Sequence, residues 1–299
     1  MSCGTRRSDR LLLTALAALW LAGCAAGGVP QAPARPERIC SVSLAGDELL
    51  ALLVPVERVV CVSALADDPE TSNVAGFYPP AIPRLSANIE PVIASRPDLV
   101  VAAPWNEGGF LRLLARSGIP SLVLDEVRDF DGLRALVVRL GERLGEPERA
   151  RAVVADLDRR LEALRSRRPE PGARPRVLSL SHSVVAGAGT TVDALIRAAG
   201  GRNAAAEAGV TGHRKLSVER ILAIDPDVLL LGFDPGGSPD AALASTPALA
   251  SMRAVREGRV VVLPPRLLTT VSPHLIEGAE RLAAALGSGR VARHGGIER

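Results

Sequence analysis

Short, almost fully apolar runs alternate with stretches of helical periodicity along most of the chain. Runs without polar alternation are typical of strands buried on both faces of a parallel sheet. They form two sets separated by a long segment without strand signals, which predicts two α/β lobes. The runs are Ile39–Leu44, Val59–Val62, Leu99–Ala102 and Leu122–Leu124, then Val177–Leu180, Val228–Leu231 and Val260–Leu263.

One long helix is predicted between the two sets of strands. Pro147 suits the first position of a helix. At 1.5 Å per residue, a helix from Pro147 to Arg168 would span roughly 33 Å, enough to bridge two small lobes. The Pro-rich stretch 169–172 would end it. One apolar stripe follows the 3.6-residue period at Ala150, Val153, Val154, Leu157, Leu161 and Leu164.

The first residues have the pattern of an export signal. Arg6, Arg7 and Arg10 precede the apolar run Leu11–Leu21, which leads through small residues to Cys24. A spanning helix needs about 20 apolar residues, and this run is roughly half that length. We therefore expect residues 1–23 to be a signal peptide. Residues 24–37, rich in Gly, Pro and Ala, are expected to form a flexible tether.

The remaining boundaries follow from the same patterns. We expect an N-terminal lobe over 38–128, helices including the long one over 129–171, a C-terminal lobe over 172–287 and a disordered tail over 288–299. Hydrophobic residues make up 47% of the chain, so most of it is predicted to be globular. The net charge is only +3, and nearly all basic residues are arginine. We expect no nucleic-acid partner.

Four cysteines are too few for a disulfide scaffold. Cys3 belongs to the predicted signal peptide, and Cys24 stands at its cleavage site. Cys40 and Cys61 lie in apolar runs, and we expect them to be buried free thiols. The alternative is a disulfide between neighbouring parallel strands, which an oxidising compartment would permit.

An internal repeat links the two predicted lobes. Asn88-Ile89-Glu90 is followed, seven residues after the glutamate, by Pro97-Asp98 and an apolar run; Ser217-Val218-Glu219 is followed at the same spacing by Pro226-Asp227 and another run. Each copy predicts a capping residue, a short helix with a glutamate in its first turn, and a buried strand. Helix-dipole compensation explains either glutamate alone. Dipole compensation explains less well why a glutamate occurs at the matching position of both lobes.

The chain resembles the substrate-binding proteins of ABC importers for cobalamin, ferric siderophores and haem over about Arg38 to Leu286. The resemblance implies two Rossmann-like α/β lobes with parallel sheets, joined by a single long rigid helix. Its main matching segments are Arg38–Ser43 with Glu48, Asn88–Glu90 through Arg96–Val100, Ala199–Asn203, Leu216–Glu219 and Asp225–Val228.

The resemblance also implies roles for particular residues. Leu21-Ala22-Gly23-Cys24 resembles a lipobox, which implies a lipid anchor on Cys24 at the periplasmic side of a bacterial membrane. Glu90 and Glu219 would dock on an ABC permease, which works with its ATPase. A corrinoid or ferric-siderophore ligand would lie in the cleft between the lobes, and we expect no further cofactor and a monomer. The cleft candidates are Trp105, Asp67, Asp68, Tyr78, His182 and Arg266.

Some of these residues allow other interpretations. Trp105 would stack on a flat ligand, or else pack against its own loop. His182, His213 and His274 suggest a metal ligand, but exposed loop histidines are the simpler interpretation. Haem ligation by Tyr78 or a histidine stays open.

Gly187-Ala188-Gly189 lacks the third glycine of a dinucleotide motif. Ser181-His182-Ser183 without a Gly-x-Ser-x-Gly elbow argues against an enzyme; a structural lipoprotein without ligand is the remaining alternative.

Overall fold

The computed structural model describes residues 34–86, 88–106, 108–181, 183–232 and 247–288. Every described residue belongs to one compact unit, residues 32–299. The predicted signal peptide, Cys24, most of the tether, His182 and the tail beyond Ser288 lie outside the described residues. Within the described ranges, no helix combines the length and apolarity needed to cross a membrane.

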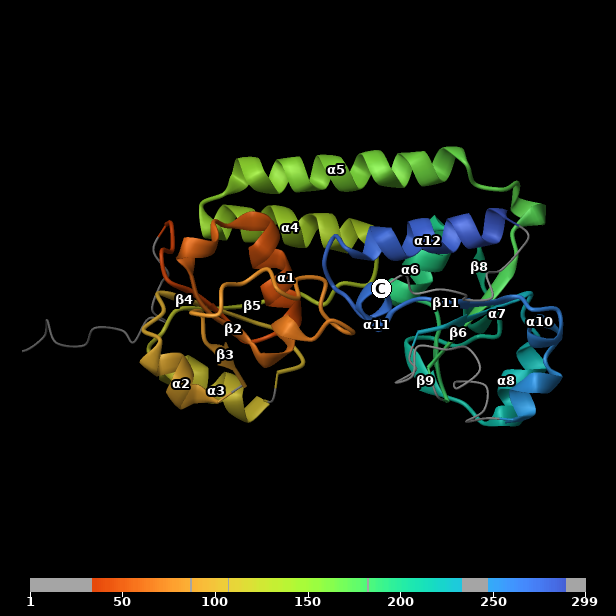
Figure 1. Cartoon of the computed structure of the whole chain (residues 1–299), viewed down its shortest axis with the longest axis horizontal. Coiled ribbons are helices and arrows are strands. Elements are labelled where there is room, and N and C mark those ends of the chain that lie inside the picture. Colours follow the sequence, from red (N-terminus) through yellow and green to blue (C-terminus); the bar gives the residue numbers. More distant parts are fainter. Residues whose placement is uncertain (1–33, 87, 107, 182, 233–246, 289–299) are drawn as a thin grey trace, which may run out of the picture. The chain divides into compact units, whose positions relative to one another are not determined.

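The N-terminal lobe is built on a five-stranded parallel sheet with strand order β3-β2-β1-β4-β5. Alternate strand residues face opposite sides, so Ile39 packs toward α1 and α4 while Cys40 packs toward α2 and α3 (Figure 1). The strands are β1 Ile39–Ser41, β2 Val59–Ser63, β3 Arg84–Leu85, β4 Leu99–Ala102 and β5 Ser121–Val123. The helices are α1 Leu44–Leu53, α2 Ile89–Ala94, α3 Gly108–Arg116 and α4 Phe130–Leu144.

The C-terminal lobe is built on a six-stranded sheet of order β11-β10-β6-β7-β9, with β8 also paired to β6. This sheet is mixed, because β7 runs antiparallel to β6 and β9. The predicted parallel pairing holds for β11, β10, β6 and β8, whereas β7 and β9 add an antiparallel edge that the sequence did not predict. Two residues separate β6 from β7, and a connection that short can join only antiparallel strands. The strands are β6 Arg176–Ser181, β7 Val184–Ala186, β8 Arg202–Asn203, β9 His213–Lys215, β10 Val228–Leu231 and β11 Val260–Val262.

Helices cover both faces of this second sheet (Figure 1). They are α6 Thr191–Ala198, α7 Ala204–Glu207, α8 Val218–Ile224, α10 Arg253–Arg256, α11 Pro265–Leu268 and α12 Leu275–Gly287. Single 3-10 turns are formed by Val56–Arg58, Ala64–Asp67, Pro171–Ala173 and Pro247–Ser251.

The long connecting helix is α5, Pro147–Ser166, with proline in its first turn as predicted. It contacts α1 of the N-terminal lobe and α6 and α12 of the C-terminal lobe (Figure 1). Its buried stripe is Ala150, Leu157 and Leu164. Gly141 of α4 lets the two helices cross closely, because a β-carbon there would meet that of Ala150 at 2.3 Å. The predicted fold of two α/β lobes joined by one long helix is confirmed.

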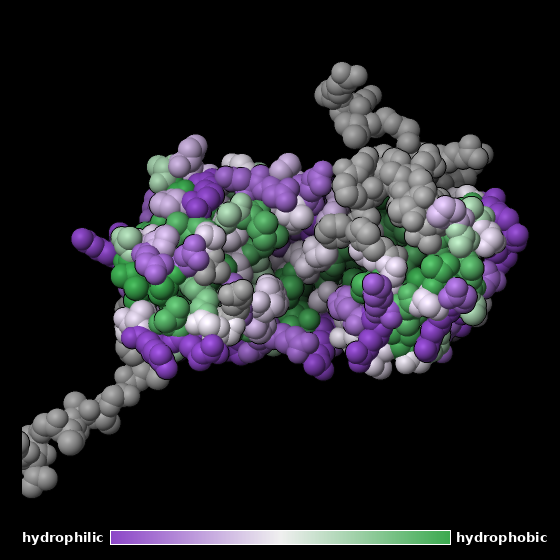
Figure 2. Space-filling view, turned by 90° about the horizontal axis from the view of Figure 1, so that it is seen from below, coloured by the Kyte–Doolittle hydropathy of each residue, from purple (hydrophilic) through white to green (hydrophobic). Residues whose placement is uncertain are grey.

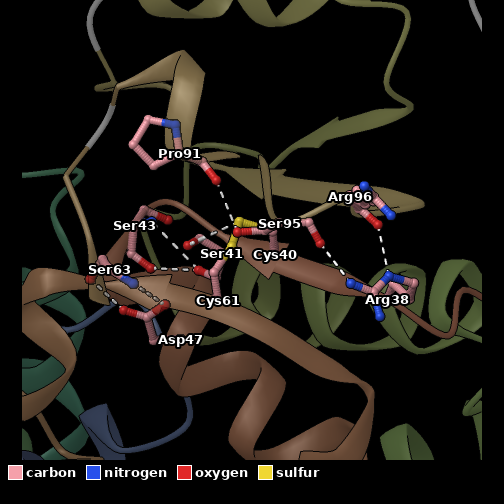
Figure 3. The surroundings of a disulfide bond; sticks show 10 residues. All are labelled: Arg38, Cys40, Ser41, Ser43, Asp47, Cys61, Ser63, Pro91, Ser95 and Arg96. Carbon is pink, nitrogen blue, oxygen red and sulfur yellow. Dashed lines mark hydrogen bonds between the residues drawn. A yellow bond between two sulfur atoms is a disulfide. The ribbon is translucent and has the colours of Figure 1, made fainter. Parts of the chain in front are cut away.

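Cys40 and Cys61 form a disulfide between β1 and β2 (Figure 3). The expectation of two free thiols is wrong. The two residues are register partners on adjacent parallel strands, with their α-carbons 4.7 Å apart. Side chains of such partners point to the same face of the sheet, so the sulfurs meet. The disulfide lies in the apolar layer between the sheet and helices α2 and α3.

Candidate functional site

A pocket of about 670 Å³ lies between the two lobes and is the candidate ligand site. Figure 2 looks onto the face away from α5 and shows apolar surface in the hollow there. The N-terminal lobe contributes Trp105, Glu126, Val127 and Arg128, and the C-terminal lobe mostly small and apolar residues. A pocket of this volume, with apolar walls and a few polar groups, suits a single organic ligand.

Trp105 stands in the loop that follows β4 and leaves 57% of its surface exposed. The loop is fixed by Asn106, whose side-chain oxygen accepts from the Ala103 N–H at 2.7 Å and whose amide donates to the Val42 carbonyl at 3.1 Å. Trp105 therefore lines the pocket on a fixed turn and does not fold back to pack against its own loop. Asn106 positions it, and sequence reasoning missed that residue because its partner Val42 is remote in sequence.

The opposite wall is formed by the β6–β7 hairpin, the first turn of α6 and the end of α11. Val184 of β7 is 37% exposed. Thr190 caps α6 by accepting from the Asp193 N–H at 3.1 Å, and the capping turn leaves Gly189 at a φ of +75°. The glycine-rich segment that resembled a nucleotide motif is thus a tight turn into a helix. His213 of β9 is exposed and also lines this wall.

Tyr78 is not a pocket residue. It is 2% exposed, and its hydroxyl donates to the backbone oxygen of Asp47 at 2.5 Å. Burial, and then the neighbouring Asp47 carboxylate, raise the pKa of its phenol. The expectation that Tyr78 faces the cleft is therefore wrong: this hydroxyl satisfies a core carbonyl and offers no oxygen to a ligand.

Three other cleft candidates lie outside the pocket lining as well. Asp67 pairs with Arg84 at 2.8 Å, and that hydrogen bond lowers the pKa of its carboxyl. Asp68 accepts from the Glu70 N–H and the Thr71 hydroxyl, of which the first lowers its pKa most. Arg266 donates its backbone N–H to the Glu70 oxygen, so it joins the lobes to each other.

The structure describes two histidines, His213 and His274. Within the described ranges, no group of three or more His, Cys, Asp or Glu side chains is placed to hold a metal ion. His274, expected to be exposed, is half-buried at the start of α12, and burial lowers the pKa of its imidazole. His213 is therefore the described histidine that faces the interlobe pocket.

A buried carboxylate, for which the sequence predicted no contact between the lobes, joins them. Glu48 of α1 is 1% exposed. Its Oε1 accepts from the backbone N–H and the side-chain amide of Asn73 at 3.0 and 2.9 Å. Its Oε2 accepts from the hydroxyls of Thr270 at 2.5 Å and Ser272 at 2.6 Å, which belong to the C-terminal lobe. Glu48 thus holds the segment between α11 and α12 against the N-terminal lobe.

The neighbouring Asp47 is also fully buried, beside the end of β2 (Figure 3). It accepts from the Ser63 N–H at 3.1 Å and the Ser63 hydroxyl at 2.5 Å. Burial is the largest influence and raises its pKa from 3.8 to about 6. The folded state therefore binds this proton more tightly than the unfolded chain does.

Asp47 is expected to make stability fall as the pH rises from acid to neutral. The stability that the raised pKa of Asp47 contributes is fully present below the unfolded pKa of 3.8. It is lost as the pH rises through the folded pKa of about 6. The loss amounts to about 3 kcal/mol. Asp47→Asn should flatten the curve of unfolding free energy against pH, measured by urea denaturation. The lowered pKa of His274 makes stability rise with pH in both proteins. The effect of Asp47 is therefore the difference between the two curves. Parallel curves would contradict this assignment.

The sequence repeat is also a structural repeat. Asp98 accepts from the Arg38 N–H at 3.0 Å, and Asp227 accepts from the Arg176 N–H at 2.8 Å, so each aspartate fixes the entry to a lobe's first strand. The side chain of each arginine donates to carbonyls at the end of the helix that precedes the aspartate, α2 for Arg38 and α8 for Arg176. The residues before the prolines, Arg96 and Asp225, are the two non-glycine residues with positive φ in the described ranges.

The two glutamates take no part in this structural repeat. Glu90 and Glu219 are exposed in the first turns of α2 and α8, on the side of each sheet away from α5 (Figure 1). Backbone hydrogen bonding in the first turn, and then Ser217, lower the pKa of Glu219. Ser217 caps α8 as predicted, whereas the Asn88 side chain bonds to Ser86 and does not cap α2.

The chain is similar in sequence and in fold to known binding proteins. The sequence profile of the family described as "Periplasmic binding protein" matches residues 39–267. A cobalamin-binding protein of Halobacterium salinarum is 28% identical over 84% of this chain and 69% of its own length. An uncharacterised ABC transporter substrate-binding lipoprotein of Bacillus subtilis is 24% identical over 84% and 80%. The crystal structure of a periplasmic haem-binding protein from Pseudomonas aeruginosa superposes with a TM-score of 0.71, at 28% identity, over 84% of this chain and 92% of that one.

Proposed function

Since the chain belongs to the periplasmic binding protein family and is a substrate-binding protein of an ABC transporter, we propose that it captures a corrinoid or ferric siderophore between its lobes. The family is not enzymatic, as the sequence suggested. The observation that carries the ligand proposal is Trp105, held half-exposed at an apolar pocket of about 670 Å³. A flat conjugated or metal-chelate ligand stacks on such a ring.

The cobalamin-binding relative from Halobacterium salinarum supports a corrinoid. Haem is the second candidate, and His213 is the observation that favours it, because an imidazole facing the pocket can coordinate iron. The haem-binding structure from Pseudomonas aeruginosa supports the same alternative. Corrinoid and haem share a flat macrocycle around a metal, so an exposed tryptophan beside an apolar pocket supports either class.

Native mass spectrometry of residues 32–299 with cyanocobalamin, ferric siderophores and haemin tests this proposal. We expect one ligand of this panel to bind with one-to-one stoichiometry. No complex with any of them, while the protein remains folded by circular dichroism, would reject the ligand class.

We further propose that the protein acts outside the cytoplasm, tethered by lipid on Cys24, and delivers its ligand to a permease through Glu90 and Glu219. Supporting the docking role, both carboxylates are exposed, occur once per lobe and take no part in the hydrogen bonds of the structural repeat. Tethering near the transporter would raise the effective concentration of the two partners.

The double variant Glu90→Lys, Glu219→Lys should abolish stimulation of the transporter's ATPase while leaving ligand affinity within about twofold, because charge reversal repels a cationic docking surface and the glutamates are remote from the pocket. Glu57→Lys, Glu162→Lys is the matched control, since both residues are exposed and lie outside α2 and α8. Equal loss of stimulation in both double variants would contradict the docking role.

A further inference from the structure

A second groove, of about 660 Å³, lies between the first turn of α4, the end of α5, and α6 with β8. It shares no lining residue with the interlobe pocket. Six arginines line it, and we call it the arginine groove: Arg134, Arg165, Arg168, Arg174, Arg197 and Arg202. A groove with this many guanidinium groups needs compensating negative charge.

The carboxylates of the arginine groove compensate only part of this charge. Asp131 pairs with Arg134, Asp193 with Arg197, and Glu207 with Arg202. Asp129 caps α4 by accepting from the Gly132 N–H at 2.8 Å. Arg165 pairs with Glu162, outside the lining. Within the described part of the chain, Arg168 and Arg174 have no carboxylate partner.

Arg168 is the least compensated of these residues. Its Nε is buried and has no hydrogen-bond partner among the described residues. The aliphatic part of the Arg168 side chain packs over Gly200, where a β-carbon would lie 3.5 Å from the Cγ of Arg168. Burial, followed by the charges of Arg174, Arg165 and Arg197, lowers the pKa of its guanidinium. The chain thus holds a half-buried cation among others of the same sign.

Helix dipoles explain part of the cluster. Arg165 and Arg197 lie in the last turns of α5 and α6, where the partial negative charge of the helix end favours cations. Arg174 lies beyond α5, in the segment leading to β6, where it donates to the Pro169 carbonyl at 3.1 Å. The dipoles therefore do not account for the gathering of Arg168 with Arg174.

We propose that the arginine groove binds a phosphate group, with Arg168 and Arg174 as its principal ligands. Guanidinium forks match the oxygens of phosphate in pairs, and a tetrahedral anion presents oxygens toward donors arriving from several elements. The phosphate can be free in solution or carried on a lipid headgroup. This site is separate from the proposed ligand pocket and does not depend on what that pocket binds.

Titration calorimetry of residues 32–299 with inorganic pyrophosphate at low ionic strength, against sodium chloride of equal ionic strength, tests the free form. We expect saturable binding with pyrophosphate alone. Arg168→Gln, Arg174→Gln should weaken it by about tenfold or more, because charge-assisted hydrogen bonds are lost. The matched control Arg151→Gln, Arg159→Gln removes the same charge from exposed sites on α5 and should bind like the parent protein.

Co-sedimentation with phosphatidylglycerol vesicles, against phosphatidylcholine vesicles, tests the lipid-borne form with the same variants. Binding to the anionic vesicles that is lost only in Arg168→Gln, Arg174→Gln identifies the lipid headgroup as the source. The proposal is overturned if neither pyrophosphate nor anionic vesicles bind, or if both double variants weaken binding equally, since net charge alone would then explain it. Circular dichroism of each variant verifies folding.

Discussion

Glu48→Ala is expected to lower the free energy of unfolding by about 3 kcal/mol. The substitution removes the acceptor of four hydrogen bonds at a position that is 1% exposed. Thr270 and Ser272 can still bond to each other, because their hydroxyl oxygens lie 2.8 Å apart. The side-chain amide of the half-buried Asn73 retains the Arg266 carbonyl as a partner, whereas its backbone N–H loses its acceptor. Urea denaturation followed by circular dichroism measures the change.

Two control variants separate the hydrogen bonds from the charge. In Glu48→Gln, the amide oxygen can still accept from Asn73, and the amide nitrogen can donate to the hydroxyl oxygens of Thr270 and Ser272. We therefore expect the free energy of unfolding to fall by only about 1 kcal/mol. Glu57→Ala, at an exposed position, should change stability by less than about 0.5 kcal/mol. A Glu48→Ala protein as stable as the Glu57→Ala protein would show that the contact between the lobes does not depend on this carboxylate.

Trp105→Ala is expected to weaken binding of the pocket ligand by about 30- to 150-fold, which corresponds to about 2–3 kcal/mol. This free energy corresponds to covering the 57% of the Trp105 surface that is now exposed. Asn106→Ala should have a smaller effect in the same direction, because it loosens the turn that presents the ring. Titration calorimetry with the ligand identified by mass spectrometry measures both.

Phe77→Ala is the matched control for this prediction. Phe77 is an aromatic residue with 48% of its surface exposed, and it lies outside the pocket lining. Its loss should leave affinity unchanged. If Trp105→Ala binds as tightly as Phe77→Ala, the ligand does not cover Trp105, and the role assigned to the tryptophan is wrong.

The strands that could be predicted are those buried on both faces. β4 and β10 have the predicted bounds, Leu99–Ala102 and Val228–Leu231, because all their side chains are apolar and buried. β9 consists of three exposed polar residues, His213–Lys215, and is held only by its pairing with β7. Such an edge strand has no hydrophobic signal in the sequence.

A site residue can be predicted from the sequence only where its type and its local position already point to a role. Trp105 is a large aromatic residue that follows a buried strand, which predicts a place at the cleft, and it lines the pocket in the structure. Tyr78 is a cleft candidate in the sequence as a possible haem ligand, yet its hydroxyl donates to the backbone oxygen of Asp47. Glu48 and Thr270 are 222 residues apart, so no local pattern could reveal the contact between them.

The fluorescence of Trp105 tests the central claim most directly, because it is the only tryptophan in residues 32–299. We would titrate this unit with cyanocobalamin, ferric siderophores and haemin, with corrections for absorption by each ligand. The account predicts saturable quenching by one of these ligands at micromolar or lower concentration. Absence of quenching by all of them, with calorimetry also silent, would contradict capture of a metal-centred organic ligand between the lobes.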